Sequence, residues 1–328
     1  GTGASNAITG VGFQPDMVWA KSRSAAESHA LCDAVRGATK ILYPNGTNAT
    51  TTVAETLKTF DSDGYTIGTN SGWNTSAETY AAWNWKAGTT SGLTGGTITP
   101  NSYSFNTTSG CSIIEFDGNG SAGATVPHGL GVAPDMVIVK KSSSTAHWTI
   151  YHAGLGATKY LTFATVAAVA ATNRWNDTAP TSTVFSLGTD TDVNGSGVTY
   201  MAYCFAGKNG FSKFGTYVGN ANNDGPFLYT GFKPSFVVTK RTDSTSDWVM
   251  KTAAVYDPPM NVNEKYLYAN SDQAEVDSGG FAFFDFLSNG FKWRNSDAAI
   301  NASAADYVYM AFAEFPIVSS NDVPTVAR

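Results

Sequence analysis

The chain is poor in cysteine. Its 328 residues include three cysteines, Cys32, Cys111 and Cys204, an odd number without the paired spacing of a disulfide framework or a zinc site. Cys32 and Cys204 lie inside apolar segments, where a thiol acts as a small hydrophobic side chain, so we expect both to be buried and free. A protein that folds in a reducing cell and then works outside it would show this pattern.

Charged residues are also scarce. They make up 14% of the chain, against roughly 25% in average proteins, so solubility must depend mainly on Ser, Thr, Asn and Gly. The net charge of −6 and the absence of a Lys/Arg cluster argue against binding to nucleic acid or to an anionic membrane. No apolar run approaches the roughly 18 residues of a membrane-spanning helix, so we expect no membrane insertion.

The sequence lacks the local signatures of catalysis. It has no nucleophile elbow and no phosphate-binding loop, and its glutamates are too scattered to nominate a carboxylate pair. The four histidines stand at no zinc-ligand spacing. We therefore predict no catalytic residue, no enzyme activity and no cofactor. Because the carboxylates of glycosidases come from distant strands, a polysaccharide-degrading activity stays open as an alternative.

One segment begins like a calcium loop. Asp190, Asp192 and Asn194 offer oxygen atoms at alternate positions, and Gly195 takes the place of the loop glycine. Such loops end on a bidentate carboxylate, and the residue at that position here is Met201. We favour a turn before a strand, and Asp190, Asp192 and Asn194 remain the single metal candidate.

The most informative feature is a segment that occurs three times. The related decamers are GFQPDMVWAK at residues 12–21, GVAPDMVIVK at 131–140 and GFKPSFVVTK at 231–240. Self-similarity at a period of about 100 residues indicates that one structural unit was copied.

Other landmarks keep step with the decamers. The hexamers GATKIL (37–42) and GATKYL (156–161) follow the first two, and Lys265 matches their lysines in the third copy. Aligned on these hexamers, His29 and Trp148 share one position, which favours a packing or surface-aromatic role over catalysis. Each copy closes on a strand-like segment, and we align its leading asparagine and tyrosine as Asn74 and Tyr80, Asn194 and Tyr200, and Asn301 and Tyr309.

The repeats divide the chain into three modules. We place module 1 at residues 1–92, module 2 at 93–208, module 3 at 209–317 and a C-terminal tail at 318–328. Only residues 1–11 precede the first decamer, whereas an apolar segment and a turn precede the other two. We therefore expect module 1 to be shortened at its N-terminal side.

The local sequence is typical of β structure. In each decamer a proline precedes β-branched and aromatic residues, and the closing segments 80–85 and 200–205 are apolar on both faces, as interior strands are. Only residues 164–172 look helical. The predicted fold class is all-β, with three tandem repeats forming sandwich-like modules packed side by side. A propeller-like radial closure is the alternative.

Aromatic residues beside amides suggest where a ligand would bind. Aromatic rings pack on the apolar faces of sugars, while Asn, Asp and Thr hydrogen-bond the hydroxyl groups. Two tryptophan–asparagine pairs lie in polar, loop-like sequence, Trp73 with Asn74 and Trp175 with Asn176. These four residues are the predicted glycan contacts.

In combination, the repeated motifs resemble a known family. The decamers, the GATKYL hexamer, the segment 211–245 and the closing YVYMAFAEFP are similar to the repeat-bearing virion proteins of tailed bacteriophages, the tail-fibre or receptor-binding proteins of marine phages. The resemblance covers essentially the whole chain. It implies a β-rich, cofactor-free protein that is made in the host cytoplasm and displayed on the virion surface. The implied partners are a host-surface glycan or other receptor and other virion proteins.

Three functions compete at this point. The first is a phage adhesin that binds host glycan, the second is a structural or capsid-decoration protein, and the third is a polysaccharide-degrading spike. Fibre proteins are commonly homotrimers, although three copies in one chain could supply a threefold shape alone.

Overall fold

A computed structural model describes residues 1–253, 261–277 and 283–313. In these ranges strands dominate, and the four helices have four residues each. All strand pairs are antiparallel, so the predicted all-β class is confirmed. The tail predicted at 318–328 and the end of module 3 lie outside the described residues.

Module 1 has a main sheet in the order β3-β2-β8, a second sheet in the order β1-β7-β6, and a small hairpin, β4-β5. Its elements are β1 (Asn6–Ile8), β2 (Met17–Ser22), β3 (Ala30–Asp33), β4 (Lys40–Ile41), β5 (Thr51–Thr52), β6 (Leu57–Asp61), β7 (Gly64–Ile67), α1 (Ser71–Asn74) and β8 (Tyr80–Trp85).

Module 2 repeats this plan with a main sheet in the order β13-β12-β17-β10-β9, a second sheet β11-β16 and a hairpin β14-β15. Its elements are β9 (Ser102–Asn106), β10 (Cys111–Asp117), β11 (Ala124–Pro127), β12 (Met136–Lys141), β13 (Thr149–His152), β14 (Lys159–Tyr160), β15 (Val169–Ala170), α2 (Thr172–Trp175), β16 (Val184–Leu187), α3 (Thr191–Asn194) and β17 (Thr199–Phe205). The helix expected at 164–172 is wrong, because α2 begins only at Thr172.

Module 3 has a main sheet in the order β18-β26-β20-β21-β22-β23 and a second sheet in the order β19-β25-β24. Its elements are β18 (Ser212–Val218), β19 (Phe227–Tyr229), β20 (Pro234–Arg241), β21 (Trp248–Thr252), β22 (Lys265–Tyr268), β23 (Val276–Asp277), β24 (Phe284–Leu287), β25 (Gly290–Trp293), α4 (Ala298–Asn301) and β26 (Asp306–Ala313). Each decamer therefore forms an inner strand of a main sheet, β2, β12 or β20, and the closing segment of the same module forms its neighbour, β8, β17 or β26.

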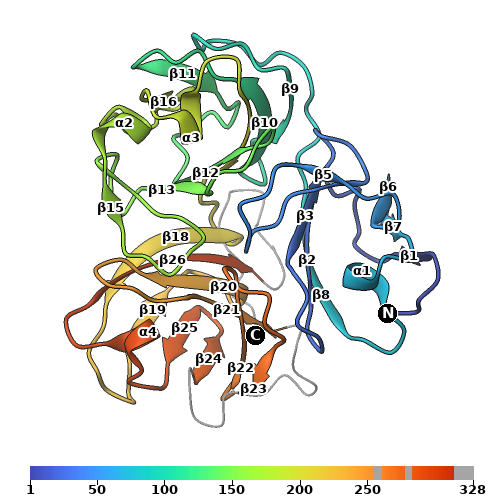
Figure 1. The fold of residues 1–328 in the computed structure, drawn as a ribbon. Coiled ribbons are helices and arrows are strands. Elements are labelled where there is room, and N and C mark those ends of the chain that lie inside the picture. The colour runs from blue at the N-terminus through green and yellow to red at the C-terminus, as the bar shows by residue number, and fades with distance from the viewer. Residues whose placement is uncertain (254–260, 278–282, 314–328) are drawn as a thin grey trace.

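The modules surround a common centre (Figure 1). One face of every main sheet contributes to a single shared core, and the other face packs against the second sheet of its own module. At the centre the rings of Trp85, Phe205 and Phe312 form a triangle with centroid separations of 6.1, 5.5 and 6.1 Å. The modules are thus sandwich-like, as predicted, and they close radially. Apolar residues on both strand faces are explained by these two cores.

A ring of hydrogen bonds joins each module to another. The indole Nε1 of Trp148 donates to the Tyr43 carbonyl at 3.0 Å, and that of Trp248 donates to the Thr162 carbonyl at 2.8 Å. His29 completes the circle, because its Nε2 lies 2.9 Å from the Tyr268 carbonyl. A side chain of module 2 is therefore hydrogen-bonded to the backbone of module 1, one of module 3 to the backbone of module 2, and one of module 1 to the backbone of module 3. The shared position of His29 and Trp148 has a packing role, as expected.

The lysine that ends each decamer is buried. Lys140 donates from Nζ to the Thr47 carbonyl at 3.2 Å, and Lys240 donates to the Thr165 carbonyl at 3.0 Å, each across a module boundary. Burial lowers the pKa of Lys21, Lys140 and Lys240 to about 8. These repeated lysines tie backbone segments together instead of presenting charge to solvent.

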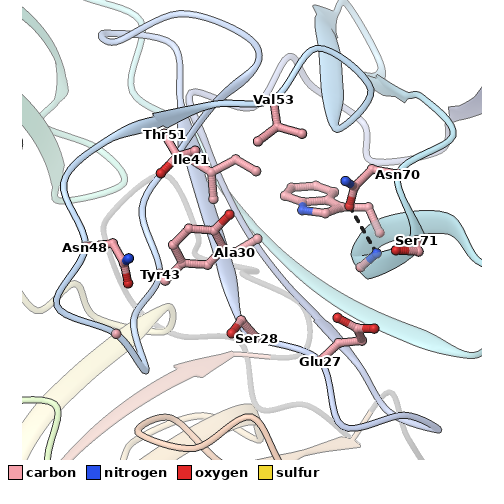
Figure 2. Close-up of a pocket in the computed structure, with 13 residues that line it drawn as sticks. Glu27, Ser28, Ala30, Ile41, Tyr43, Asn48, Thr51, Val53, Asn70 and Ser71 are labelled. Carbon is pink, nitrogen blue, oxygen red and sulfur yellow. Dashed lines mark hydrogen bonds between the residues drawn. The ribbon is translucent and has the colours of Figure 1, made fainter.

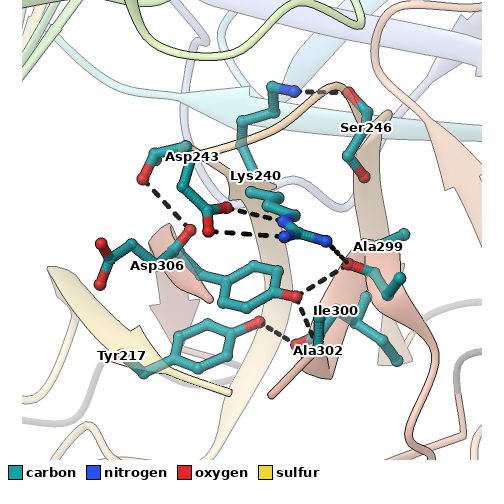
Figure 3. Close-up of polar contacts among 12 residues, drawn as sticks. Tyr217, Lys240, Asp243, Ser246, Ala299, Ile300, Ala302 and Asp306 are labelled. Carbon is teal, nitrogen blue, oxygen red and sulfur yellow. Dashed lines mark hydrogen bonds and ion pairs between the residues drawn. The ribbon is translucent and has the colours of Figure 1, made fainter. Parts of the chain in front are cut away.

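A repeated tyrosine supports the short helix before each closing strand. In module 3 the Tyr307 hydroxyl accepts from the Ala302 nitrogen and donates to the Ala298 carbonyl, both at 2.8 Å (Figure 3). Tyr80 and Tyr200 make the same two bonds in their modules. The expected match of Tyr309 to these tyrosines is wrong, because the strand register pairs Phe236 with Phe312 and so makes Tyr307 the equivalent.

The asparagine of each copy is fully buried, and its side chain forms hydrogen bonds with backbone groups. Asn194 accepts from the Asn119 nitrogen at 2.9 Å and donates to the carbonyls of Ser121 and Gly188 at 2.9 and 2.8 Å. Asn74 and Asn301 make the equivalent contacts with their own loops. The side chain thus fixes the turn between the main and second sheets in every module.

Replacing Asn194 with alanine should lower the free energy of unfolding by about 3 kcal/mol, since one buried and two partly buried backbone groups lose their partner. Chemical denaturation followed by circular dichroism measures the change. Asn101→Ala is the matched control, because that side chain is exposed and should change stability by no more than about 0.5 kcal/mol. Equal effects of the two substitutions would contradict the structural role of Asn194.

Candidate functional site

The predicted glycan contacts are mostly buried. Asn74 is 0% exposed and Trp175 is 2% exposed, with its ring 5.9 Å from that of Tyr151 inside the core of module 2. Neither side chain reaches solvent, so the predictions for Asn74 and Trp175 are wrong. Asn176 is half-buried in a left-handed conformation at the end of α2, and its tryptophan partner faces the other way, into the core. Trp73 is 5% exposed and forms one wall of a cleft.

The calcium candidate does not form a metal site. The guanidinium of Arg174 lies 2.8 Å from a carboxylate oxygen of Asp190 and 2.9 Å from one of Asp192. Asp190 also begins α3 by accepting from the Asp192 nitrogen, and the Asn194 side chain is bonded to the backbone. A cation from the same chain therefore neutralises both carboxylates, which leaves the calcium candidate Asp190, Asp192 and Asn194 without free carboxylates for a metal ion. In the described part of the chain no other cluster of metal-binding side chains occurs.

The cleft beside Trp73 is the candidate site. It has a volume of about 540 Å³ and lies in module 1 between the segment before β3, the β4-β5 hairpin and the start of α1 (Figure 2). Its polar lining comes from Glu27, Ser28, Asn48, Thr51, Asn70 and Ser71. Its apolar and aromatic lining comes from Ala30, Ile41, Tyr43, Val53 and Trp73, with backbone from Gly46 and Gly72.

The walls of the cleft are fixed by hydrogen bonds. The Asn70 side chain accepts from the Gly72 nitrogen at 3.0 Å and so begins α1, the helix that carries Trp73. On the opposite wall, Asn45 donates to the Ser28 hydroxyl at 3.2 Å and accepts from the His29 nitrogen at 2.9 Å. The site is therefore held ready for a ligand, which lowers the entropic cost of binding.

The electrostatic character of the cleft is set by one carboxylate. Glu27 is the sole charged residue among the described lining residues, and its side chain has no hydrogen-bond or ion-pair partner in the described structure. Burial, with a smaller contribution from Cys32, raises the pKa of Tyr43, so its hydroxyl stays neutral and able to donate.

The arrangement suits recognition more than catalysis. Aromatic rings, amides and hydroxyl groups in one cleft are the groups that bind sugars. Hydrolysis of a glycosidic bond needs two carboxyl groups across the scissile bond, and the described lining supplies only Glu27.

Sequence reasoning missed Glu27, Tyr43 and Asn70. Tyr43 follows the GATKIL hexamer directly, and Glu27 stands where module 2 has Ala146. Glu27 is unique to one copy, whereas the position of Tyr43 is occupied by Thr162 in module 2 and by Tyr268 in module 3. For Glu27, the difference between copies was the available signal.

A second hollow lies where modules 2 and 3 meet. Its volume is about 460 Å³, and Asp135, Lys208, Lys213 and Tyr229 contribute to its lining. Tyr229 is 60% exposed, and the Lys213 ammonium lies 5.3 Å from the centre of its ring. Because the lysine already covers this ring, the hollow is a poorer platform for a sugar and serves as a comparison site.

Comparisons with other proteins concern the whole chain. No curated protein and no solved structure matches it. No helix in the described ranges is long and apolar enough to cross a bilayer. The model of one family matches residues 1–316, nearly the full length, and the chain therefore belongs to that family, which is described as a domain of unknown function, DUF7483.

Proposed function

We propose that this protein is a surface protein of a bacteriophage virion, a tail fibre or spike, that binds host-surface glycan through the cleft of module 1. The virion assignment rests on the resemblance of the repeats to phage receptor-binding proteins. The observation that carries the binding role is the preformed cleft in which Tyr43 and Trp73 accompany amides, hydroxyl groups and one unpaired carboxylate.

The scaffold supports such a role. Three modules joined in a ring by buried hydrogen bonds provide a rigid body on which a loop-lined cleft keeps its shape. A single sugar cleft binds weakly, and display of many copies on one particle would raise the avidity by orders of magnitude.

The same ring favours the structural alternative. A decoration protein needs a rigid shape and no ligand, and the three-module ring alone satisfies that need. A glycan array combined with an assay for released reducing sugar separates the candidates. Binding without release is the expected result, neither binding nor release would favour the structural role, and release would favour a degrading spike.

Replacing Tyr43 with alanine should weaken glycan binding about tenfold, equivalent to about 1.4 kcal/mol, because one aromatic surface of the cleft is lost. Titration calorimetry with a glycan identified on the array measures the affinity. Tyr43 is preferable to Trp73 as the target because it is half-buried, and its removal disturbs the core less.

Tyr229→Ala is the matched control, since it removes an exposed tyrosine from the second hollow. It should leave the affinity unchanged. The reverse pattern, with loss only in Tyr229→Ala, would move the site to the boundary between modules 2 and 3.

A further inference from the structure

Module 2 fills the space that corresponds to the cleft with one of its own side chains. The guanidinium of Arg174 lies 4.5 Å from the centre of the Tyr160 ring, and it also contacts the carboxylates of Asp190 and Asp192 and the Thr149 hydroxyl. A cation over an aromatic ring and against two carboxylates is a satisfied arrangement. Module 2 therefore shows which chemistry this position in the fold accommodates.

The equivalent of Arg174 in module 1 is Thr56. The Gly188 nitrogen donates to the Arg174 carbonyl at 2.9 Å, and the Gly68 nitrogen donates to the Thr56 carbonyl at 2.7 Å, the same bond in both copies. The Thr56 hydroxyl donates a hydrogen bond to the Val53 carbonyl at 2.7 Å. Its short side chain leaves the space of the guanidinium open.

Every partner of Arg174 has changed in module 1. Tyr160, Thr149, Asp190 and Asp192 correspond by alignment to Ile41, Ala30, Asn70 and Gly72. All four replacements line the cleft. The cleft thus lies where the Arg174 side chain lies in module 2. Module 1 lacks both this side chain and the residues that bind it, which accounts for the position and shape of the cleft.

Relative to module 2, module 1 lacks the charges of the arginine and the two aspartates and has gained one carboxylate. Glu27 replaces Ala146, it is half-buried on the cleft wall, and no described side chain pairs with it. The cleft consequently combines the space of a cation with a carboxylate that forms no ion pair, although the buried Lys21 ammonium attracts it electrostatically. An acidic ligand would meet like charge there, whereas an ammonium group would meet opposite charge.

We infer that the cleft of module 1 selects an amino sugar, with its ammonium group against Glu27 and its ring beside Tyr43 and Trp73, and that it rejects acidic sugars. This inference rests on the proposed glycan-binding function and specifies the class of sugar. The ligand takes the place in module 1 that the Arg174 side chain takes in module 2.

Calorimetric titration of the full chain at pH 6 with three tetrasaccharides tests the inference. The probes are a glucosamine oligomer, its N-acetylated counterpart and a galacturonic acid oligomer. The glucosamine oligomer should bind at least about tenfold more tightly than the N-acetylated one, and the acidic oligomer should bind most weakly. Equal affinity for the amino and N-acetylated oligomers would overturn the inference while leaving glycan binding intact, and the absence of binding by any sugar, on the array as well, would overturn both.

Glu27→Gln should reduce the preference for the amino oligomer to within about twofold and keep the affinity for the N-acetylated one. Asp117→Asn is the matched control, because it removes the same charge from an exposed strand end and should keep the full preference. A Glu27→Gln variant that retains the full preference would overturn the role of this carboxylate.

A third variant introduces into module 1 the arginine and the two aspartates that fill this space in module 2. Thr56→Arg combined with Asn70→Asp and Gly72→Asp should abolish binding of all three oligosaccharides while the circular dichroism spectrum stays that of the parent. A folded variant with undiminished binding would show that the ligand does not occupy this space, and it would overturn the inference.

Discussion

Replacing Trp148 with alanine should lower the free energy of unfolding by about 3–5 kcal/mol, the range for removing a large buried aromatic side chain. The ring is 2% exposed in the shared core, where its centroid lies 5.7 Å from that of Phe163 and 6.2 Å from that of Tyr203. Its Nε1 also donates to carbonyls of module 1, at Tyr43 and Gly46. The substitution therefore removes packing at the centre and a link between two modules at once.

Chemical denaturation with circular dichroism and tryptophan fluorescence as parallel probes measures this effect. Trp148→Phe keeps much of the apolar ring and loses the donor, so it should cost about 2 kcal/mol. If the modules form one cooperative unit, the two probes report a single transition in the wild type. A loss below about 1 kcal/mol for Trp148→Ala would mean that the ring of intermodule bonds adds little to stability.

The repeats made the fold readable from the sequence. A decamer that recurs with a proline before β-branched and aromatic residues is expected to form the same strand in each copy. β2 and β12 begin two residues after the proline as expected, and β20 begins at Pro234 itself. The burial of both faces of β17 also followed from its composition. The same expectation for residues 80–85 is wrong, because β8 is the edge strand of its sheet and is only partly buried. The sequence could not show what packs against the inner face of each main sheet, because side-by-side sandwiches and a radial ring of modules bury the same residues.

The site was less readable, for a reason that the repeats explain. One asparagine is retained in all three copies, as Asn74, Asn194 and Asn301. Its side-chain amide stabilises the common turn and is already hydrogen-bonded to the backbone, so it cannot bind a ligand. A residue found in one copy, such as Glu27, has a side chain that makes no such backbone contact. Tryptophan beside asparagine suggested an exposed sugar platform, but burial depends on tertiary packing that no local pattern contains.

Replacing Arg36 with leucine should lower the free energy of unfolding by about 3–5 kcal/mol, the cost of leaving a buried charge without its partner. Arg36 donates from Nε to Asp33 at 2.6 Å, and the two side chains are 2% and 0% exposed. The Tyr203 hydroxyl of module 2 donates to the same carboxylate at 2.8 Å. The pair thus lies at the boundary of modules 1 and 2, in the setting where an unpaired carboxylate is most costly.

The double variant Asp33→Asn/Arg36→Leu should recover more than half of that loss, because the neutral amide still accepts from Tyr203 and no buried charge remains. Module 2 supports this expectation, since it has His152 and Leu155 at the same two positions, with the His152 ring against the Tyr309 carbonyl at 3.2 Å and no ion pair. Denaturation of both single variants and the double variant gives the coupling free energy between the two residues. A double variant no more stable than Arg36→Leu would show that the loss comes from the guanidinium packing and its bond to the Leu31 carbonyl, and not from the stranded carboxylate.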